Sequence, residues 1–83
     1  MKTLHDRLVA LAKTANAKLE ALDLDVELDF YTQGLDSLDH VQILMMVEEA
    51  FDVHFEDTDY DECHSIERIA DYLVRAGHAA AQP

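Results

Sequence analysis

The chain has 83 residues, 49% of them apolar, with two glycines, one proline and a formal net charge of −12. This length allows one small hydrophobic core and excludes a second domain or a deep substrate cleft. So few glycines and prolines among so many apolar residues are typical of a folded helical domain rather than a disordered segment. We therefore expect one all-α domain over residues 1–77, followed by a frayed tail over residues 78–83.

The acidic residues are distributed unevenly. Between Leu19 and Glu67 there are 16 acidic residues and no Lys or Arg, whereas four of the six basic residues lie in the first 18 positions. Such a surface repels nucleic acid phosphates and anionic membranes, so we expect neither as a partner. It attracts basic protein surfaces, although acidic residues also serve simply to keep a small protein soluble.

No segment has the features of a membrane anchor or a signal peptide. The longest apolar run, Ile43–Val47, is too short to cross a bilayer, and Asp6 and Arg7 interrupt the apolar residues near the N-terminus. The single cysteine, Cys63, cannot form an internal disulfide. These features predict a cytoplasmic protein, which we expect to be a monomer.

Apolar residues recur every three or four positions in the first segment, which predicts a helix over Thr3–Ala21. Its inward-facing residues are Leu4, Leu8, Leu11, Ala15, Leu19 and Leu22. Thr3 and Asp6 have the spacing of a capping pair at its start.

Acidic and apolar residues then alternate strictly from Asp23 to Phe30. Alternation indicates a strand, but no second strand is predicted to pair with it, and a lone strand is not stable. We therefore predict an extended loop in which Leu24, Val26, Leu28 and Phe30 pack against the helices.

The acids of this loop have the spacing of an EF-hand, as do those of Asp57–Asp61. A calcium loop needs Gly at its sixth position and Glu at its twelfth. Leu28 and Gly34 take these positions in the first stretch, and Glu62 and Arg68 take them in the second. A dedicated calcium loop is therefore not predicted, and a calcium-responsive protein is only a distant third hypothesis.

The stretch GLDSLDHV, residues 34–41, precedes an apolar run and predicts the start of a second helix that extends to about Phe51. Asp36 is placed to cap this helix with Asp39 as its partner, and Gly34 permits the tight turn before it.

Two further helical segments are predicted downstream. A short helical turn covers Asp57–Glu62, and Ser65 caps a last helix over Ile66–Ala76, which Gly77 ends. The inward residues of the last helix are Ile66, Ile69, Ala70 and Leu73.

The second helix carries two apolar arcs when its residues are placed at 100° intervals. The arc expected to face the core holds Ile43, Leu44, Val47 and Phe51. The other arc holds Leu38, Val41 and Met45, alongside Gln42, Glu48 and Glu49. This second arc is either an exposed docking surface with an acidic rim or a surface covered by the loop of residues 23–35.

Ser37 has three possible roles: a helix-cap residue, a nucleophile, or the acceptor of a modification made by another enzyme. His40 lies three residues further on, within reach on a helix. However, the motif is not G-x-S-x-G, and a hydrolase also needs an orienting acid and a sheltered pocket. A self-contained serine hydrolase is therefore not predicted.

Gly34–Leu38 resembles the 4′-phosphopantetheine attachment motif of acyl carrier proteins. Val47–Val53 resembles the family's "(L/I)EE-x-F-(D/G)" segment, and Ser65–Leu73 resembles the start and body of its last helix. Asp29–Tyr31 resembles the loop that leads into the serine. The likeness extends over about Asp29–Leu73.

This resemblance implies a bundle of three main helices plus one short helix, in a protein that is not an enzyme. Ser37 would carry a covalent 4′-phosphopantetheine derived from coenzyme A, with an acyl group attached as a thioester. The implied partners are a phosphopantetheinyl transferase, an acyl-loading ligase or acyltransferase, and synthase enzymes with basic docking patches. The implied docking residues are Asp36, Leu38, Asp39, Val41, Met45, Glu48 and Glu49.

Some positions depart from the pattern of central fatty-acid carriers. Thr32 and Gln33 stand where those carriers usually have an acid and a leucine, Gln42 replaces a third docking acid, and Leu35 is widespread in specialised carriers. The sequence therefore favours a dedicated lipid, polyketide or secondary-metabolite carrier. The alternatives are a central fatty-acid carrier, a peptidyl or aminoacyl carrier, and an unmodified helical adaptor that binds a basic partner.

The remaining candidates are histidines and the cysteine. His40 could line the mouth of an acyl cavity, but we expect it to hydrogen-bond the preceding loop. His54, Cys63 and His64 match no zinc-binding spacing, so no metal site is predicted. We expect Cys63 to be a small buried apolar residue.

Overall fold

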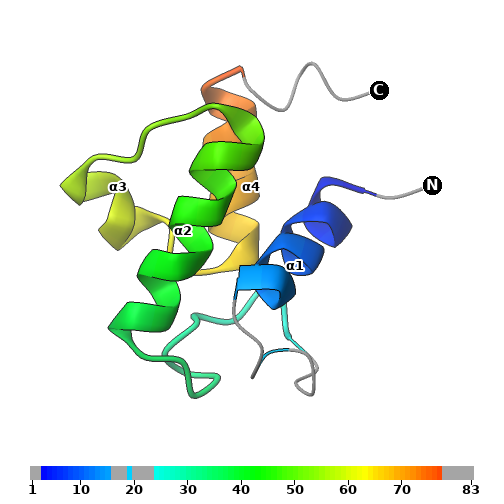
Figure 1. The fold of residues 1–83 in the computed structure, drawn as a ribbon, viewed down its shortest axis with the longest axis vertical. Helices are drawn as coiled ribbons and strands as arrows, with labels where there is room; N and C mark the ends of the chain where they lie inside the picture. The colour runs from blue at the N-terminus through cyan, green and yellow to red at the C-terminus, as the bar shows by residue number, and fades with distance from the viewer. Residues whose placement is uncertain (1–2, 16–18, 20–23, 78–83) are drawn as a thin grey trace.

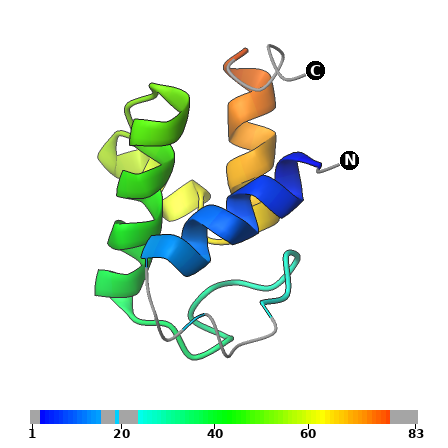
Figure 2. The ribbon, with the colours of Figure 1, turned by 45° about the vertical axis from the view of Figure 1, so that its right-hand side comes forward.

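The computed structural model describes residues 3–15, 19 and 24–77. They form four helices, α1 (Leu4–Ala15), α2 (Ser37–Phe51), α3 (Asp57–Glu62) and α4 (Ile66–Arg75), with no strand in the described part of the chain. α2 and α4 both run upward from a base made by residues 24–36, and α1 runs obliquely across them (Figure 1, Figure 2). The predicted all-α class is confirmed.

The core lies where α1 packs against α2 and α4. Its fully buried members from these helices are Leu8, Ala12, Ile43, Leu44, Val47, Ile66, Ile69 and Leu73. The predicted inward arcs of α2 and α4 are thus confirmed, since Phe51 and Ala70 are also buried. Leu8 of α1 and Leu19, which lies beyond the end of α1, are fully buried, while Leu4 and Leu11 are partly buried against the same cluster.

Short-range hydrogen bonds fix the helix ends at or near the predicted positions. Thr3 Oγ1 accepts the N–H of Asp6 at 3.1 Å, and Ser65 Oγ accepts the N–H of Arg68 at 3.1 Å. Gly77 follows α4 with a φ of 83°, the left-handed conformation expected after a helix end. The predicted C-terminal part of the first helix from residue 16 on, apart from buried Leu19, lies outside the described residues, as do Leu22 and the tail 78–83.

The prediction that all four apolar residues of the loop pack inward is wrong at one position. Leu24 and Phe30 are buried and Val26 packs against the core, but Leu28 is 44% exposed. The side chain of Asp25 accepts the N–H of Glu27 at 2.9 Å and bends the chain there. Alternation assigns residues to faces only in an extended chain, so the bend turns Leu28 outward.

Gln33 and one backbone hydrogen bond hold the loop in place. The Gln33 amide oxygen accepts the N–H of Asp25 at 2.7 Å, and its Nε2 donates to the carbonyls of Asp25 at 2.9 Å and Leu28 at 3.0 Å. The loop is joined to the rest of the molecule by the N–H of Phe30, which donates to the carbonyl of His64 at 2.8 Å. The glutamine that departs from the family pattern therefore organises this loop.

Among the residues described, no helix has both the length and the apolar character needed to cross a membrane.

Candidate functional site

Ser37 is the first residue of α2, and its side chain is exposed. The residue before it caps the helix: Asp36 Oδ1 accepts the N–H of Asp39 at 2.9 Å, and Asp39 Oδ2 accepts the N–H of Asp36 at 3.0 Å. Within the described part of the chain, Ser37 Oγ makes no hydrogen bond. Since the cap is complete without it, the serine hydroxyl is free to react.

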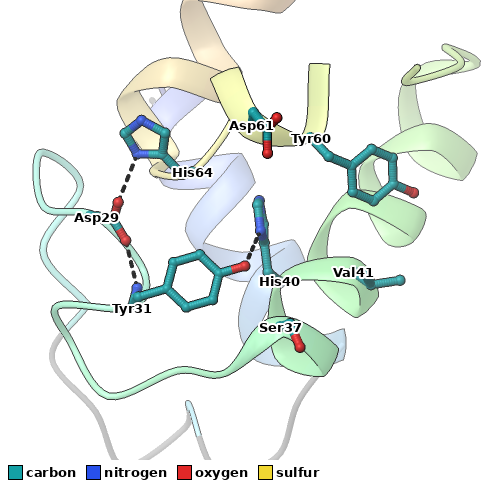
Figure 3. A pocket seen from close by; sticks show the side chains of 8 residues that line it. All are labelled: Asp29, Tyr31, Ser37, His40, Val41, Tyr60, Asp61 and His64. Atoms are coloured by element: carbon teal, nitrogen blue, oxygen red, sulfur yellow. Dashed lines mark hydrogen bonds and ion pairs between the residues drawn. The ribbon is translucent and has the colours of Figure 1, made fainter. Parts of the chain in front are cut away.

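A cleft of about 350 Å³, here called the Ser37 cleft, opens beside this serine. Its walls come from the loop, α2, α3 and the turn before α4 (Figure 3). It is lined by Asp29, Tyr31, Ser37, His40, Val41, Tyr60, Asp61 and His64. Only Val41 among these residues is aliphatic, so the cleft combines aromatic rings with carboxylate, hydroxyl and imidazole groups.

His40 is almost fully buried, at 4% exposure, and both of its ring nitrogens have partners. Nε2 lies 2.8 Å from the carbonyl oxygen of Cys63, and Nδ1 lies 2.8 Å from the hydroxyl of Tyr31. A carbonyl only accepts, so Nε2–H is the donor, and in the neutral ring Nδ1 accepts from the tyrosine O–H. The expected hydrogen bond between His40 and the preceding loop is confirmed, and the ring also lines the Ser37 cleft.

The two hydrogen bonds of His40 also decide whether it could act as the base of a serine hydrolase. A general base for Ser37 needs a ring nitrogen within hydrogen-bond reach of Oγ. Both nitrogens of His40 are instead held by Tyr31 and Cys63. His40 is therefore not positioned as the base of a nucleophilic serine.

Asp29 and His64 close the side of the cleft formed by the loop. His64 Nδ1 lies 3.1 Å from Asp29 Oδ2, and Asp29 Oδ1 accepts the N–H of Tyr31 at 2.7 Å. Burial raises the pKa of Tyr31, and the carboxylates of Asp29, Asp61 and Asp36 raise it further. The Tyr31 phenol therefore remains a hydrogen-bond donor across the neutral range.

A comparison with known protein families covers this region of the chain. The model of the phosphopantetheine attachment site family matches residues 6–73, most of the chain, and this range includes Ser37 and its cleft. Curated relatives that match the chain bear the name acyl carrier protein. The chain belongs to the acyl carrier protein family.

Three relatives indicate the extent of the likeness. A mitochondrial acyl carrier protein of Neurospora crassa is 42% identical over 41 residues, 49% of this chain and 31% of its own length. Acyl carrier proteins of Syntrophobacter fumaroxidans and Bdellovibrio bacteriovorus are 45% identical over 42 residues and 39% over 46 residues. These matches cover 51% and 55% of this chain, and 52% and 59% of the relatives. No solved structure matches the chain significantly.

Acyl carrier proteins are non-catalytic carriers of a 4′-phosphopantetheine group, as the resemblance implied. In this member of the family, the second apolar arc of α2 forms an outer face that consists of Leu38, Val41 and Met45. Leu38 is 64% exposed, Met45 is 54% exposed and Val41 is half-buried. The loop of residues 24–35 therefore leaves this face largely uncovered.

The acidic side chains around the outer face differ in solvent exposure. Asp36 and Glu49 are exposed. Glu48 is only partly exposed, because its carboxylate accepts the N–H of Phe55 at 2.8 Å and lies 3.5 Å from Nδ1 of His54. Glu48 therefore stabilises the turn after α2 in addition to contributing charge.

The environment of Asp39 differs from the one that the sequence predicts. The sequence places it among the docking carboxylates, but its side chain is only 4% exposed. The capping box draws it inward, since one of its oxygens must reach the N–H of Asp36. Asp39 fixes the start of α2 and does not present its carboxylate to a partner.

The sequence did not identify most of the cleft. Asp29, Tyr31, Tyr60, Asp61 and His64 are absent from the predicted site residues, although they line it. The only available signal was the likeness of the Asp29–Tyr31 loop to the family. Cys63 is fully buried as expected, and no three His, Cys, Asp or Glu side chains among the described residues are grouped to hold a metal ion.

Proposed function

We propose that this chain carries acyl groups as thioesters on a 4′-phosphopantetheine arm attached to Ser37, in a dedicated lipid, polyketide or secondary-metabolite pathway. The observation that carries the proposal is the exposed Ser37 hydroxyl, unbonded because Asp36 caps the helix in its place. The departures at Thr32, Gln33 and Gln42 support a dedicated pathway over the central fatty-acid pathway.

The surroundings of Ser37 fit a phosphate ester. The first N–H groups of a helix have no partners in the preceding turn, and the positive end of the helix dipole favours an anion there. Asp36 opposes the phosphate by charge repulsion, but its main contact is the N–H of Asp39. The arm, when bound, supplies the thiol that forms the thioester, whereas Ser37 supplies only the attachment oxygen.

Attachment needs a partner enzyme. Ser37 Oγ would form the bond to the phosphorus of the pantetheine phosphate while the pyrophosphate bond of coenzyme A breaks, releasing adenosine bisphosphate. The hydroxyl proton must pass to a base of the transferase, since His40 is held by other groups. The proposed partners are therefore a phosphopantetheinyl transferase, an acyl-loading ligase or acyltransferase, and synthase enzymes.

The outer face of α2 is the proposed docking surface for these partners. Leu38, Val41 and Met45 would be its apolar anchors, since two of the three are more than half exposed. Asp36 and Glu49 would steer basic patches, with Glu48 adding charge from a more fixed position. Such contacts should be small and salt-sensitive, as a carrier that visits several enzymes requires.

The test is an intact-mass measurement on purified, unmodified protein incubated with coenzyme A, magnesium and a broad-specificity phosphopantetheinyl transferase. We expect the parent to gain the mass of one phosphopantetheine and Ser37→Ala to gain nothing. Ser65→Ala is the matched control, because it removes the chain's other serine and should still be modified. No gain in the folded parent would refute the carrier function and favour an unmodified adaptor.

A further inference from the structure

His40 separates the Ser37 cleft from the apolar core. On one side its ring lines the cleft with Ser37. On the other it lies 5.5 Å from the fully buried ring of Phe30 and donates to the carbonyl of Cys63, which is also fully buried. Figure 3 shows the ring projecting from α2 between the Tyr31 hydroxyl and α3. A group that enters from Ser37 therefore meets this imidazole before it can reach the core.

Moving His40 aside is costly. A long alkyl chain that passed into the core would have to break the bonds to Tyr31 and Cys63, both 2.8 Å long. The carbonyl of Cys63 would then be left buried without this partner. The Tyr60 ring, 6.2 Å from that of His40, further confines the imidazole on the α3 side.

The cleft itself offers hydrogen-bonding groups to a short acyl group. Its lining includes the phenols of Tyr31 and Tyr60 and the carboxylates of Asp29 and Asp61, but only one aliphatic side chain. Asp61 is exposed and no described residue forms a hydrogen bond or ion pair with its carboxylate, so this carboxylate can accept from a hydroxyl or amino group.

We propose that His40 bars the route from Ser37 to the core, so that this carrier bears short acyl groups with a hydrogen-bond donor and does not store a long alkyl chain. The inference rests on the proposed function, because it assumes that the arm is attached to Ser37. It deepens that function by naming the class of cargo. The short acyl group and its arm share the Ser37 cleft and stay accessible to partner enzymes.

The experiment loads the protein with butyryl, 3-hydroxybutyryl or octanoyl groups by means of a transferase that accepts acyl-coenzyme A. Intact mass verifies each loading. The rate at which hydroxylamine cleaves the thioester then measures its accessibility, and amide chemical shifts show which residues the cargo contacts. We expect octanoyl and butyryl thioesters to be cleaved at the same rate. The amide signals of the core residues Ile43 and Leu44 should not move with octanoyl, and that of Asp61 should move only with 3-hydroxybutyryl.

Two variants of the barrier and one control make the test specific. His40→Ala should open the route, so that octanoyl cleavage slows about tenfold because the chain is inside the core most of the time. His5→Ala removes a histidine from α1, outside the lining of the cleft, and should behave as the parent. Tyr31→Phe removes one of the two His40 bonds from an exposed position, and should slow octanoyl cleavage to a lesser extent even if His40→Ala does not fold.

Each part of the proposal is overturned by a different experimental result. Octanoyl protection and shifted core signals in the parent would overturn the barrier, as would rapid octanoyl cleavage in both folded barrier variants. Equal Asp61 shifts with butyryl and 3-hydroxybutyryl would overturn the preference for a donor. A parent that gains no mass at all would refute the proposed attachment at Ser37 instead.

Discussion

At the scale of single residues, neighbouring side chains have separate tasks at the start of α2. Asp36 and Asp39 bond to each other's backbone N–H groups, which leaves the Ser37 hydroxyl exposed. One turn later, His40 is buried and held at both ring nitrogens. An exposed hydroxyl and a fixed imidazole therefore lie three residues apart on the same helix.

The burial of Cys63 predicts that its thiol is unreactive in the folded protein. Burial raises the pKa of its thiol to about 12, and the carboxylates of Asp59 and Glu62 add to the effect. Because the thiolate is the reactive form, the native protein at pH 8 should react with a thiol reagent only through unfolding. The measurement is the labelling rate with and without denaturant, and rapid labelling of the native protein would contradict the burial of Cys63.

The raised pKa of Cys63 also makes the free energy of unfolding depend on pH. The folded pKa of about 12 lies above the ordinary value of 9.0, so the stabilisation is complete below pH 9 and is lost as pH rises towards 12. The tyrosines with raised pKa values act in the same direction, so Cys63→Ala is needed as the reference. The difference in free energy of unfolding between parent and variant should change across this window and stay constant below it.

At the level of secondary structure, the two ends of α2 differ in how well they are stabilised. Its start has a complete capping box. Its end has Asp52 in the left-handed conformation, with φ of 54°, where a side chain is strained and glycine is not. A negative charge at the C-terminus of a helix is also unfavourable. The helix is therefore well fixed beside Ser37 and strained at its far end.

Replacing Asp52 should stabilise the protein. We expect Asp52→Gly to raise the free energy of unfolding by about 1 kcal/mol, from relief of backbone strain and loss of the charge. Asp52→Asn, which removes only the charge, should give about 0.5 kcal/mol. Urea denaturation measures both values, and a destabilised glycine variant would show that the Asp52 side chain makes a favourable contact.

At the scale of the whole molecule, charge is segregated. The net charge is −12, yet four of the six basic residues lie within the first 18 positions. The exposed acids beside the outer face of α2 therefore belong to a long stretch of sequence without Lys or Arg. A partner with a basic patch should be drawn towards α2 and Ser37.

A substitution at Glu49 tests this electrostatic steering, because its side chain is exposed and close to the outer face. Glu49→Gln should lower kcat/KM for modification by the transferase about twofold to threefold at low salt, with little change at high salt. Glu67→Gln on α4 changes the net charge equally and is also exposed, so it serves as the control. Equal effects of the two variants would mean that net charge, not the position of Glu49, governs encounter.

The sequence by itself determined the four helices, the N-terminal caps of α1, α2 and α4, and the two arcs of α2. These features depend on contacts between residues three or four apart, such as Asp36 with Asp39 and Ser65 with Arg68, which local patterns reveal. The motif around Ser37 likewise lies in one continuous stretch. Its family and its attachment motif were therefore recognisable before any fold was known.

Only the tertiary structure decided the lining of the cleft and the environment of each acid. The bond from His40 to Cys63 joins residues 23 positions apart, and no periodicity encodes it. The bonds from Phe30 to His64 and from Phe55 to Glu48 likewise depend on how loops close against helices. Short-range hydrogen bonds are fixed by neighbours along the chain, whereas a cleft forms only when distant segments are packed together.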